Sequence, residues 1–164
     1  MFFRRNQIYM SKITAAITAV GAYVPEYVLT NEILETMVET NDEWITTRTG
    51  IKERRILKDP DKGTSFLGIK AAEDLINKSG VDPSEIDMVI MATATPDLPV
   101  ASTAAYVATQ IGATNAFSYD LQAACSSFLY GMSTASAYVA SGKYKKVLLI
   151  GKVSNLFKQF FEKN

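Results

Sequence analysis

The sequence has 164 residues, a length typical of one domain, and 48% of them are hydrophobic, which is enough for a buried core. Its 17 basic and 17 acidic residues cancel, so the charge gives no reason to expect nucleic acid or an anionic membrane as a partner. One cysteine cannot form an internal disulfide, which fits a reducing cytoplasm. The complete lack of histidine excludes, within these residues, a cysteine–histidine pair and most zinc sites, and we expect no metal.

The N-terminus combines two arginines with a later apolar run, an order that superficially resembles a signal peptide. Polar residues separate the two features, and hydroxyl side chains dilute the run from residue 13 to residue 20. We therefore predict a buried first strand over 13–20 and an unstructured N-terminal extension over 1–11. No segment approaches the ~20 apolar residues of a membrane-spanning helix, so no membrane partner is expected.

The following segments alternate between helical and strand patterns. A helix is predicted with Thr30 or Asn31 as its N-cap. A shorter helix is predicted to open with a capping box of Thr40 and Glu43 and to end at Gly50. The other predicted elements are a short strand over 54–56, a helix from 64 or 65 to near 80, a bend at 83, and strands over 88–92, 116–119 and 147–151. Such alternation predicts an α/β fold with a mainly parallel sheet covered by helices.

The short helix carries Trp44 and Arg48 four residues apart, so their side chains share one face. An indole ring beside a guanidinium group suits a flat base by stacking, and the arginine also suits phosphate. Such a face would suit the nucleotide part of a ligand. The alternative is a cation–π pair that only anchors the helix.

The segment from Leu98 to Gly142 has Asp120 as its only charged residue. Helices that face solvent almost always carry lysine or glutamate. Two helices are predicted here, over 102–111 and 126–141, and we expect both to be covered on all sides.

The only cysteine, Cys125, lies between the strand over 116–119 and the second of these helices. A strand-to-helix turn places its thiol at the positive end of the helix, which favours the reactive thiolate. Backbone N–H groups of such a turn are also suited to stabilise the oxyanion of a thioester. Cys125 is therefore the candidate nucleophile, and the alternative is a small buried hydrophobic residue.

Two motifs resemble one family. The run from Gln122 to Phe128 (QAACSSF) resembles the active-site cysteine segment of β-ketoacyl-acyl-carrier-protein synthase III, which initiates bacterial fatty acid synthesis. The block over 41–55 (NDEWITTRTGIKERR) is similar to the most distinctive block of the same family. The resemblance covers residues 12–151 and implies the N-terminal half of a thiolase-like fold. Thiolases and hydroxymethylglutaryl-coenzyme A synthases share a nucleophilic cysteine, but the block around Trp44 favours synthase III.

The resemblance implies a function and its residues. An acetyl group would pass from acetyl-coenzyme A to Cys125 and then be condensed with malonyl-acyl carrier protein, in a cytoplasmic homodimer with no bound cofactor. Thr40, Trp44 and Arg48 would bind coenzyme A, and Val100 would reach the acyl pocket of the partner subunit. Many members have phenylalanine at the position of Val100, so the preferred primer stays open. The family condenses with a histidine and an asparagine from its C-terminal half.

The resemblance ends after Gly151. Residues 152–164 match no family segment and are interpreted as a divergent tail, either frameshifted or a short helix. We expect a chain truncated after its N-terminal half, unable to condense and prone to oligomerise. The alternative to a partial enzyme is a non-catalytic fragment, either inert or associated with a full-length subunit.

Overall fold

A computed structural model describes residues 13–97 and 100–151, and its main body is a three-stranded parallel sheet. The central strand β3 (Met88–Ala92) pairs with β4 (Phe117–Leu121) on one side and with β5 (Val147–Gly151) on the other. Every residue of β3 is buried, as its continuous apolar sequence predicts for a strand covered on both faces. The three predicted strands of the parallel sheet are thus confirmed.

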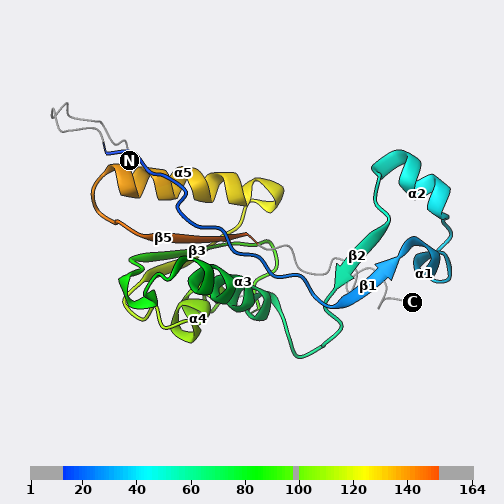
Figure 1. The fold of residues 1–164 in the computed structure, drawn as a ribbon, viewed down its shortest axis with the longest axis horizontal. Helices are drawn as coiled ribbons and strands as arrows, with labels where there is room; N and C mark the ends of the chain where they lie inside the picture. Colours follow the sequence, from blue (N-terminus) through cyan, green and yellow to red (C-terminus); the bar gives the residue numbers. More distant parts are fainter. Residues whose placement is uncertain (1–12, 98–99, 152–164) are drawn as a thin grey trace.

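Helices cover both faces of this sheet (Figure 1). The helices α3 (Thr64–Ser79) and α4 (Thr103–Gln110) pack on one face and enclose the main hydrophobic core. The core side chains from the sheet include Val89, Met91, Leu148 and Ile150. On the other face lies α5 (Ser127–Ala140), which contacts β5 and β3. A 3-10 turn, η1 (Pro83–Glu85), leads into β3 where the sequence predicts a bend.

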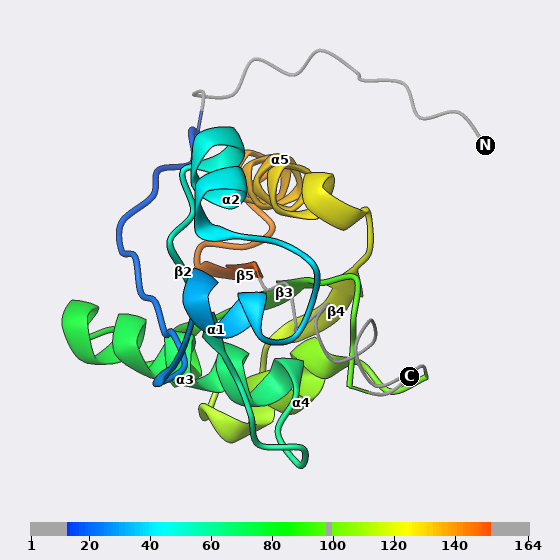
Figure 2. The ribbon, with the colours of Figure 1, turned by 90° about the vertical axis from the view of Figure 1, so that its right-hand side faces the viewer.

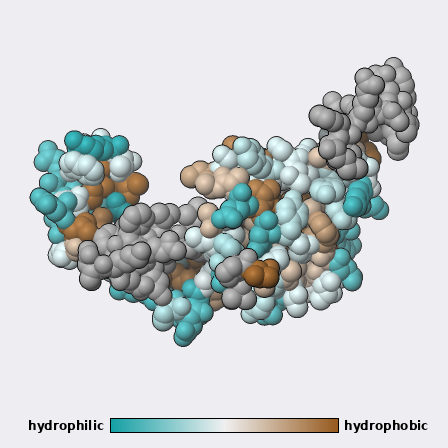
Figure 3. Space-filling view, turned by 180° about the vertical axis from the view of Figure 1, so that it is seen from behind, coloured by the Kyte–Doolittle hydropathy of each residue, from teal (hydrophilic) through white to brown (hydrophobic). Residues whose placement is uncertain are grey.

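A smaller unit precedes the sheet. The strands β1 (Tyr27–Thr30) and β2 (Glu53–Ile56) pair antiparallel, and the helices α1 (Asn31–Glu35) and α2 (Asp42–Thr49) lie between them in the chain. Leu29, Leu34 and Ile45 form its small core. Seen from behind, this unit stands apart from the main body, with a mainly hydrophilic outer side (Figure 3).

The buried Asn31 ties this small unit together. Its side-chain amide donates to the Asp42 carboxylate at 2.6 Å and to the Ile51 carbonyl at 2.8 Å, while its oxygen accepts from the Arg54 guanidinium. One side chain therefore links α1, the start of α2 and β2. The same hydrogen bond from Asn31, with a second from Thr46, lowers the pKa of Asp42.

The predicted first strand over 13–20 is wrong for the described residues. This segment forms no strand, and most of its side chains are exposed, including Ile17 at 75%. It runs extended past the sheet and reaches α3 at Gly21, where an added Cβ would lie 2.5 Å from the backbone nitrogen of Leu75. Its apolar sequence is that of a strand, but no described strand pairs with it.

Other corrections concern helix ends. The N-cap of α2 is Asn41, whose side chain accepts from the Trp44 N–H at 2.8 Å, so the predicted capping box of Thr40 and Glu43 is wrong. Thr30 caps α1 as predicted, but that helix ends at residue 35, earlier than its apolar pattern indicates. Gly50 ends α2 in the left-handed conformation, as predicted.

The expectation that α4 and α5 are covered on all sides is also wrong within the described residues. Leu129 and Tyr130 on α5 are 63% and 57% exposed, because the described chain covers only the side of α5 that meets the sheet. No helix among residues 13–97 and 100–151 is long and apolar enough to span a membrane. The predicted extension over 1–11 and tail over 152–164 lie outside the described residues.

Candidate active site

The predicted turn before α5 is present and carries an exposed, free thiol. The chain leaves β4 at Leu121, passes through a 3-10 turn, η2 (Ala124–Ser126), and enters α5 at Ser127. Ala124 has φ 46° and is the only described non-glycine residue with positive φ. Such a conformation costs an L-residue roughly 1–2 kcal/mol. Cys125 follows it directly and is exposed, so the alternative of a small buried hydrophobic residue does not hold.

Hydrogen bonds within five residues close this turn. The Ser126 N–H donates to the Ala123 carbonyl at 3.0 Å, and the Ala123 N–H donates to the Ser127 hydroxyl oxygen at 2.6 Å. The Ser127 N–H donates to the Ala124 carbonyl. Because the N–H groups of residues 126 and 127 are already engaged, the Cys125 N–H is the candidate oxyanion donor of this turn.

The helix α5, which follows the thiol, packs closely on β5. A Cβ added to Gly131 would lie 2.5 Å from a methyl carbon of Leu149, and one added to Gly151 would lie 2.6 Å from the ring of Phe128. A larger residue at either position would push α5 away from the strand. These contacts fix the axis of α5 and therefore the direction in which its N-terminus points.

Asp120, the only charged residue of its segment, caps the neighbouring helix. Its carboxylate accepts from the N–H groups of Thr103 at 2.8 Å and Ala104 at 2.7 Å, both in the first turn of α4, and from the Ser102 hydroxyl at 3.3 Å. The sequence shows this charge as isolated but not its role. Its geometry is that of a helix cap, which stabilises the N-terminus of a helix against the end of β4.

Trp44 and Arg48 lie together on the surface of α2. The Arg48 guanidinium carbon lies 4.6 Å from the centre of the indole ring, and both side chains are exposed, Trp44 at 52%. The predicted shared face is therefore confirmed. Thr40 lies one residue before the N-cap of α2 and is half-buried.

The helix α2 lies beyond the N-terminal end of α5, roughly in line with its axis. Figures 1 and 2 agree on this placement in two perpendicular views. The N-terminal end of α5, which Cys125 precedes, is thus the end nearer to α2, the helix that carries Trp44 and Arg48. The described residues do not join these groups into one pocket.

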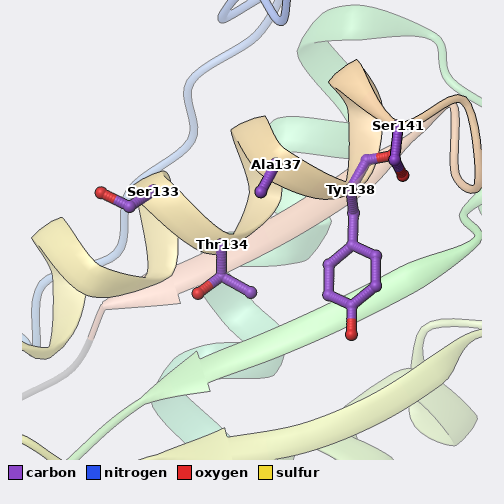
Figure 4. A pocket seen from close by; sticks show the side chains of 5 residues that line it. All are labelled: Ser133, Thr134, Ala137, Tyr138 and Ser141. Carbon is purple, nitrogen blue, oxygen red and sulfur yellow. The ribbon is translucent and has the colours of Figure 1, made fainter. Parts of the chain in front are cut away.

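Val100 is the remaining predicted site residue. Val100 is 98% exposed in the loop before α4. A hollow of about 450 Å³ lies along the C-terminal half of α5, and none of the predicted site residues lines it. Figure 4 shows Thr134 and Tyr138 reaching from α5 toward the sheet at this hollow. The described residues contain no group of three or more histidine, cysteine, aspartate or glutamate residues placed to hold a metal ion.

Comparison with known proteins agrees with the two motifs. The chain is 52% identical over 157 residues to the β-ketoacyl-[acyl-carrier-protein] synthase III of Azobacteroides pseudotrichonymphae, covering 94% of this chain and 47% of that protein. It is 55% identical over 141 residues to the enzyme of the same name from Porphyromonas gingivalis, covering 86% of this chain and 42% of that protein. The chain corresponds to the N-terminal half of β-ketoacyl-acyl-carrier-protein synthase III.

The fold agrees with this family. The structure of 3-oxoacyl-[acyl-carrier-protein] synthase III from Aquifex aeolicus superposes with a TM-score of 0.79 at 44% identity, covering 82% of this chain and 43% of that chain. The model of the 3-oxoacyl-[acyl-carrier-protein (ACP)] synthase III family matches residues 119–156, which include Cys125. The thiolase-like α/β fold is thus confirmed. This chain spans somewhat less than half the length of the synthase III relatives it matches.

Proposed function

We propose that this chain provides the acyl-accepting part of a β-ketoacyl-acyl-carrier-protein synthase III of fatty acid biosynthesis. One observation carries the proposal: Cys125 is exposed at the N-terminus of α5, in a closed turn with a left-handed residue before it. The segment containing it matches the family model. A thiol held this way is suited to attack a thioester.

The first half-reaction needs only groups near Cys125. The thiolate attacks the acetyl carbonyl carbon of acetyl-coenzyme A, and a bond forms between that carbon and the cysteine sulfur. The carbonyl oxygen becomes an oxyanion, for which the Cys125 N–H is the candidate donor in this turn. The bond to the coenzyme sulfur then breaks, and the coenzyme leaves as a thiolate that takes a proton from water. The products are acetyl-Cys125 and free coenzyme A.

Coenzyme A is held, in this proposal, by α2. Trp44 stacks on the adenine, Arg48 lies over the indole and reaches phosphate, and Thr40 contacts the base from the start of the block. The exposed face of the pair and its position beyond the N-terminus of α5 support this assignment. Stacking of a base on an aromatic side chain contributes about 1–3 kcal/mol. Loss of Trp44 is therefore expected to weaken coenzyme binding roughly 5- to 150-fold.

The second half-reaction needs groups that this sequence does not contain. Condensation with malonyl-acyl carrier protein in the resembling family uses a histidine and an asparagine of the C-terminal half, and this chain has no histidine. We infer that it does not condense by itself. The exposed Val100 suits the proposed place in the acyl pocket of a partner subunit, in a cytoplasmic homodimer.

The test is acylation of the full chain by acetyl-coenzyme A, followed by intact-mass spectrometry. We expect one acetyl adduct on the native protein and none on Cys125→Ala. Trp44→Ala is expected to reach the parental acylation rate only at higher concentrations of acetyl-coenzyme A. An adduct that persists in Cys125→Ala, or no adduct on folded protein, would refute the proposal.

A non-catalytic role is the second candidate. The exposed apolar residues of the uncharged helix α5, led by Leu129 and Tyr130, favour association with another polypeptide. In that case the chain would bind a full-length synthase III subunit without turning over substrate. Co-purification with such a subunit, together with no acetylation of Cys125, would favour this role over the first.

A further inference from the structure

The turn that presents Cys125 is closed by a buried hydroxyl that takes no part in the proposed chemistry. Ser127 is 2% exposed, and its hydroxyl oxygen accepts the Ala123 N–H at 2.6 Å. The hydrogen bond runs backward over four residues and therefore spans the nucleophile. Ser126 and Ser127 are adjacent in sequence, but only Ser127 is buried and makes this bond.

The backbone N–H and carbonyl of Ala123 are both hydrogen-bonded by residues that follow Cys125 in the chain. Its N–H is bound by the Ser127 side chain, and its carbonyl is bound by the Ser126 N–H at 3.0 Å. Between these anchors lie Ala124, with φ 46°, and Cys125. A left-handed alanine persists only where its surroundings impose it. Without the hydroxyl, one of the two anchors is lost and the Ala123 N–H loses this partner.

Loss of the Ser127 hydroxyl would change the position of the Cys125 thiol relative to α5. The turn η2 (Ala124–Ser126) fixes where Cys125 lies relative to Ser127, the first residue of α5. The sulfur is already exposed, so a looser turn adds little access for a reagent. It changes instead where the sulfur lies relative to the N-terminus of α5.

We propose that Ser127 is a positioning residue that holds Cys125 at the N-terminus of α5 in its reactive arrangement. The inference rests on the proposed function, because it assigns to Ser127 the orientation of the same nucleophile. Ser127 itself touches no substrate. It acts through the Ala123 N–H and the conformation of Ala124.

The test measures alkylation of Cys125 by iodoacetamide across pH, followed by intact-mass spectrometry on the full chain. Ser127→Ala is expected to react about fivefold more slowly at neutral pH, the factor that corresponds to one net hydrogen bond. Ser127→Thr keeps the hydroxyl and should restore most of the rate. Ser136→Ala, an exposed serine on the same helix, is the matched control and should react like the parent.

Each result decides the matter. A parental alkylation profile in Ser127→Ala overturns the proposal. Loss of the far-ultraviolet dichroism in that variant also overturns it, because the hydroxyl would then serve the whole fold and not the thiol. Alkylation needs no coenzyme. Suppose that Ser127→Ala is alkylated more slowly than the parent, but the parent is not acetylated by acetyl-coenzyme A. The proposed function then fails, while this inference stands.

Discussion

Replacing Asp120 by asparagine tests the internal cap of α4. The carboxylate makes two short bonds to backbone N–H groups at the start of that helix, to Thr103 and Ala104. Asparagine keeps the shape and one acceptor oxygen but loses the charge and the second acceptor. A hydrogen bond to a charged group contributes about 1.5–3 kcal/mol, and a negative charge at a helix N-terminus about 0.3–1 kcal/mol. We expect Asp120→Asn to lower the free energy of unfolding by about 2–3 kcal/mol.

Urea unfolding followed by circular dichroism measures this change, and the thermal midpoint should fall by roughly 5–10 °C. Asp61→Asn is the control, since Asp61 is an exposed loop residue whose carboxylate caps no helix. If the two variants differ from each other by less than about 0.5 kcal/mol, the assigned cap contributes nothing measurable and the reasoning is refuted. The midpoint of unfolding should shift without a change in the denaturant slope.

Three further changes test other parts of the chain. Gly21→Ala places a carbon 2.5 Å from the backbone nitrogen of Leu75, and it should cost about 1–3 kcal/mol of stability in the same urea assay. The lowered pKa of Asp42 stabilises the small unit at pH values above the usual carboxylate pKa near 4, and this contribution is lost as pH falls through the lowered value. The fluorescence of the single tryptophan should therefore change less with falling pH in Asp42→Asn than in the parent. The exposed side chain of Tyr130 should promote self-association, so Tyr130→Lys should shift sedimentation velocity toward monomer, and a compact parental monomer would contradict this.

The sequence predicts the parallel sheet and the cysteine turn because both depend on local patterns. The strand over 88–92 is continuously apolar, and the helix after Cys125 has helical spacing and a closing glycine. The same is true of the face shared by Trp44 and Arg48, since a spacing of four fixes it. These features need no knowledge of distant residues.

What the sequence does not reveal depends on partners elsewhere. The strand β1 pairs with β2, with Tyr27 opposite Ile56, and neither short segment shows this partner by itself. The run over 13–20 has the composition of a buried strand but no described strand beside it, so composition alone misleads. Thr40 and Asn41 both suit an N-cap, and only the bond to the Trp44 N–H distinguishes them. The bond from Ala123 to Ser127 depends on the left-handed residue between them, which no propensity predicts.

The turn at Cys125 and the unit that carries Trp44 differ in how far they depend on contacts with the rest of the protein. The turn at Cys125 is closed by bonds among residues 123–127 and supported by β4, so we expect it to form wherever the sheet forms. The uncharged outer side of α5 lacks cover among the described residues, with Leu129 63% and Tyr130 57% exposed. Burial of apolar surface contributes about 25 cal/mol per Å², so covering this side would add stability. The unit that carries Trp44 has its own small core and stands apart from the main body. Alkylation of Cys125 should therefore be less sensitive to missing cover than acylation by coenzyme A, which also needs α2 to be held at the right distance from the thiol.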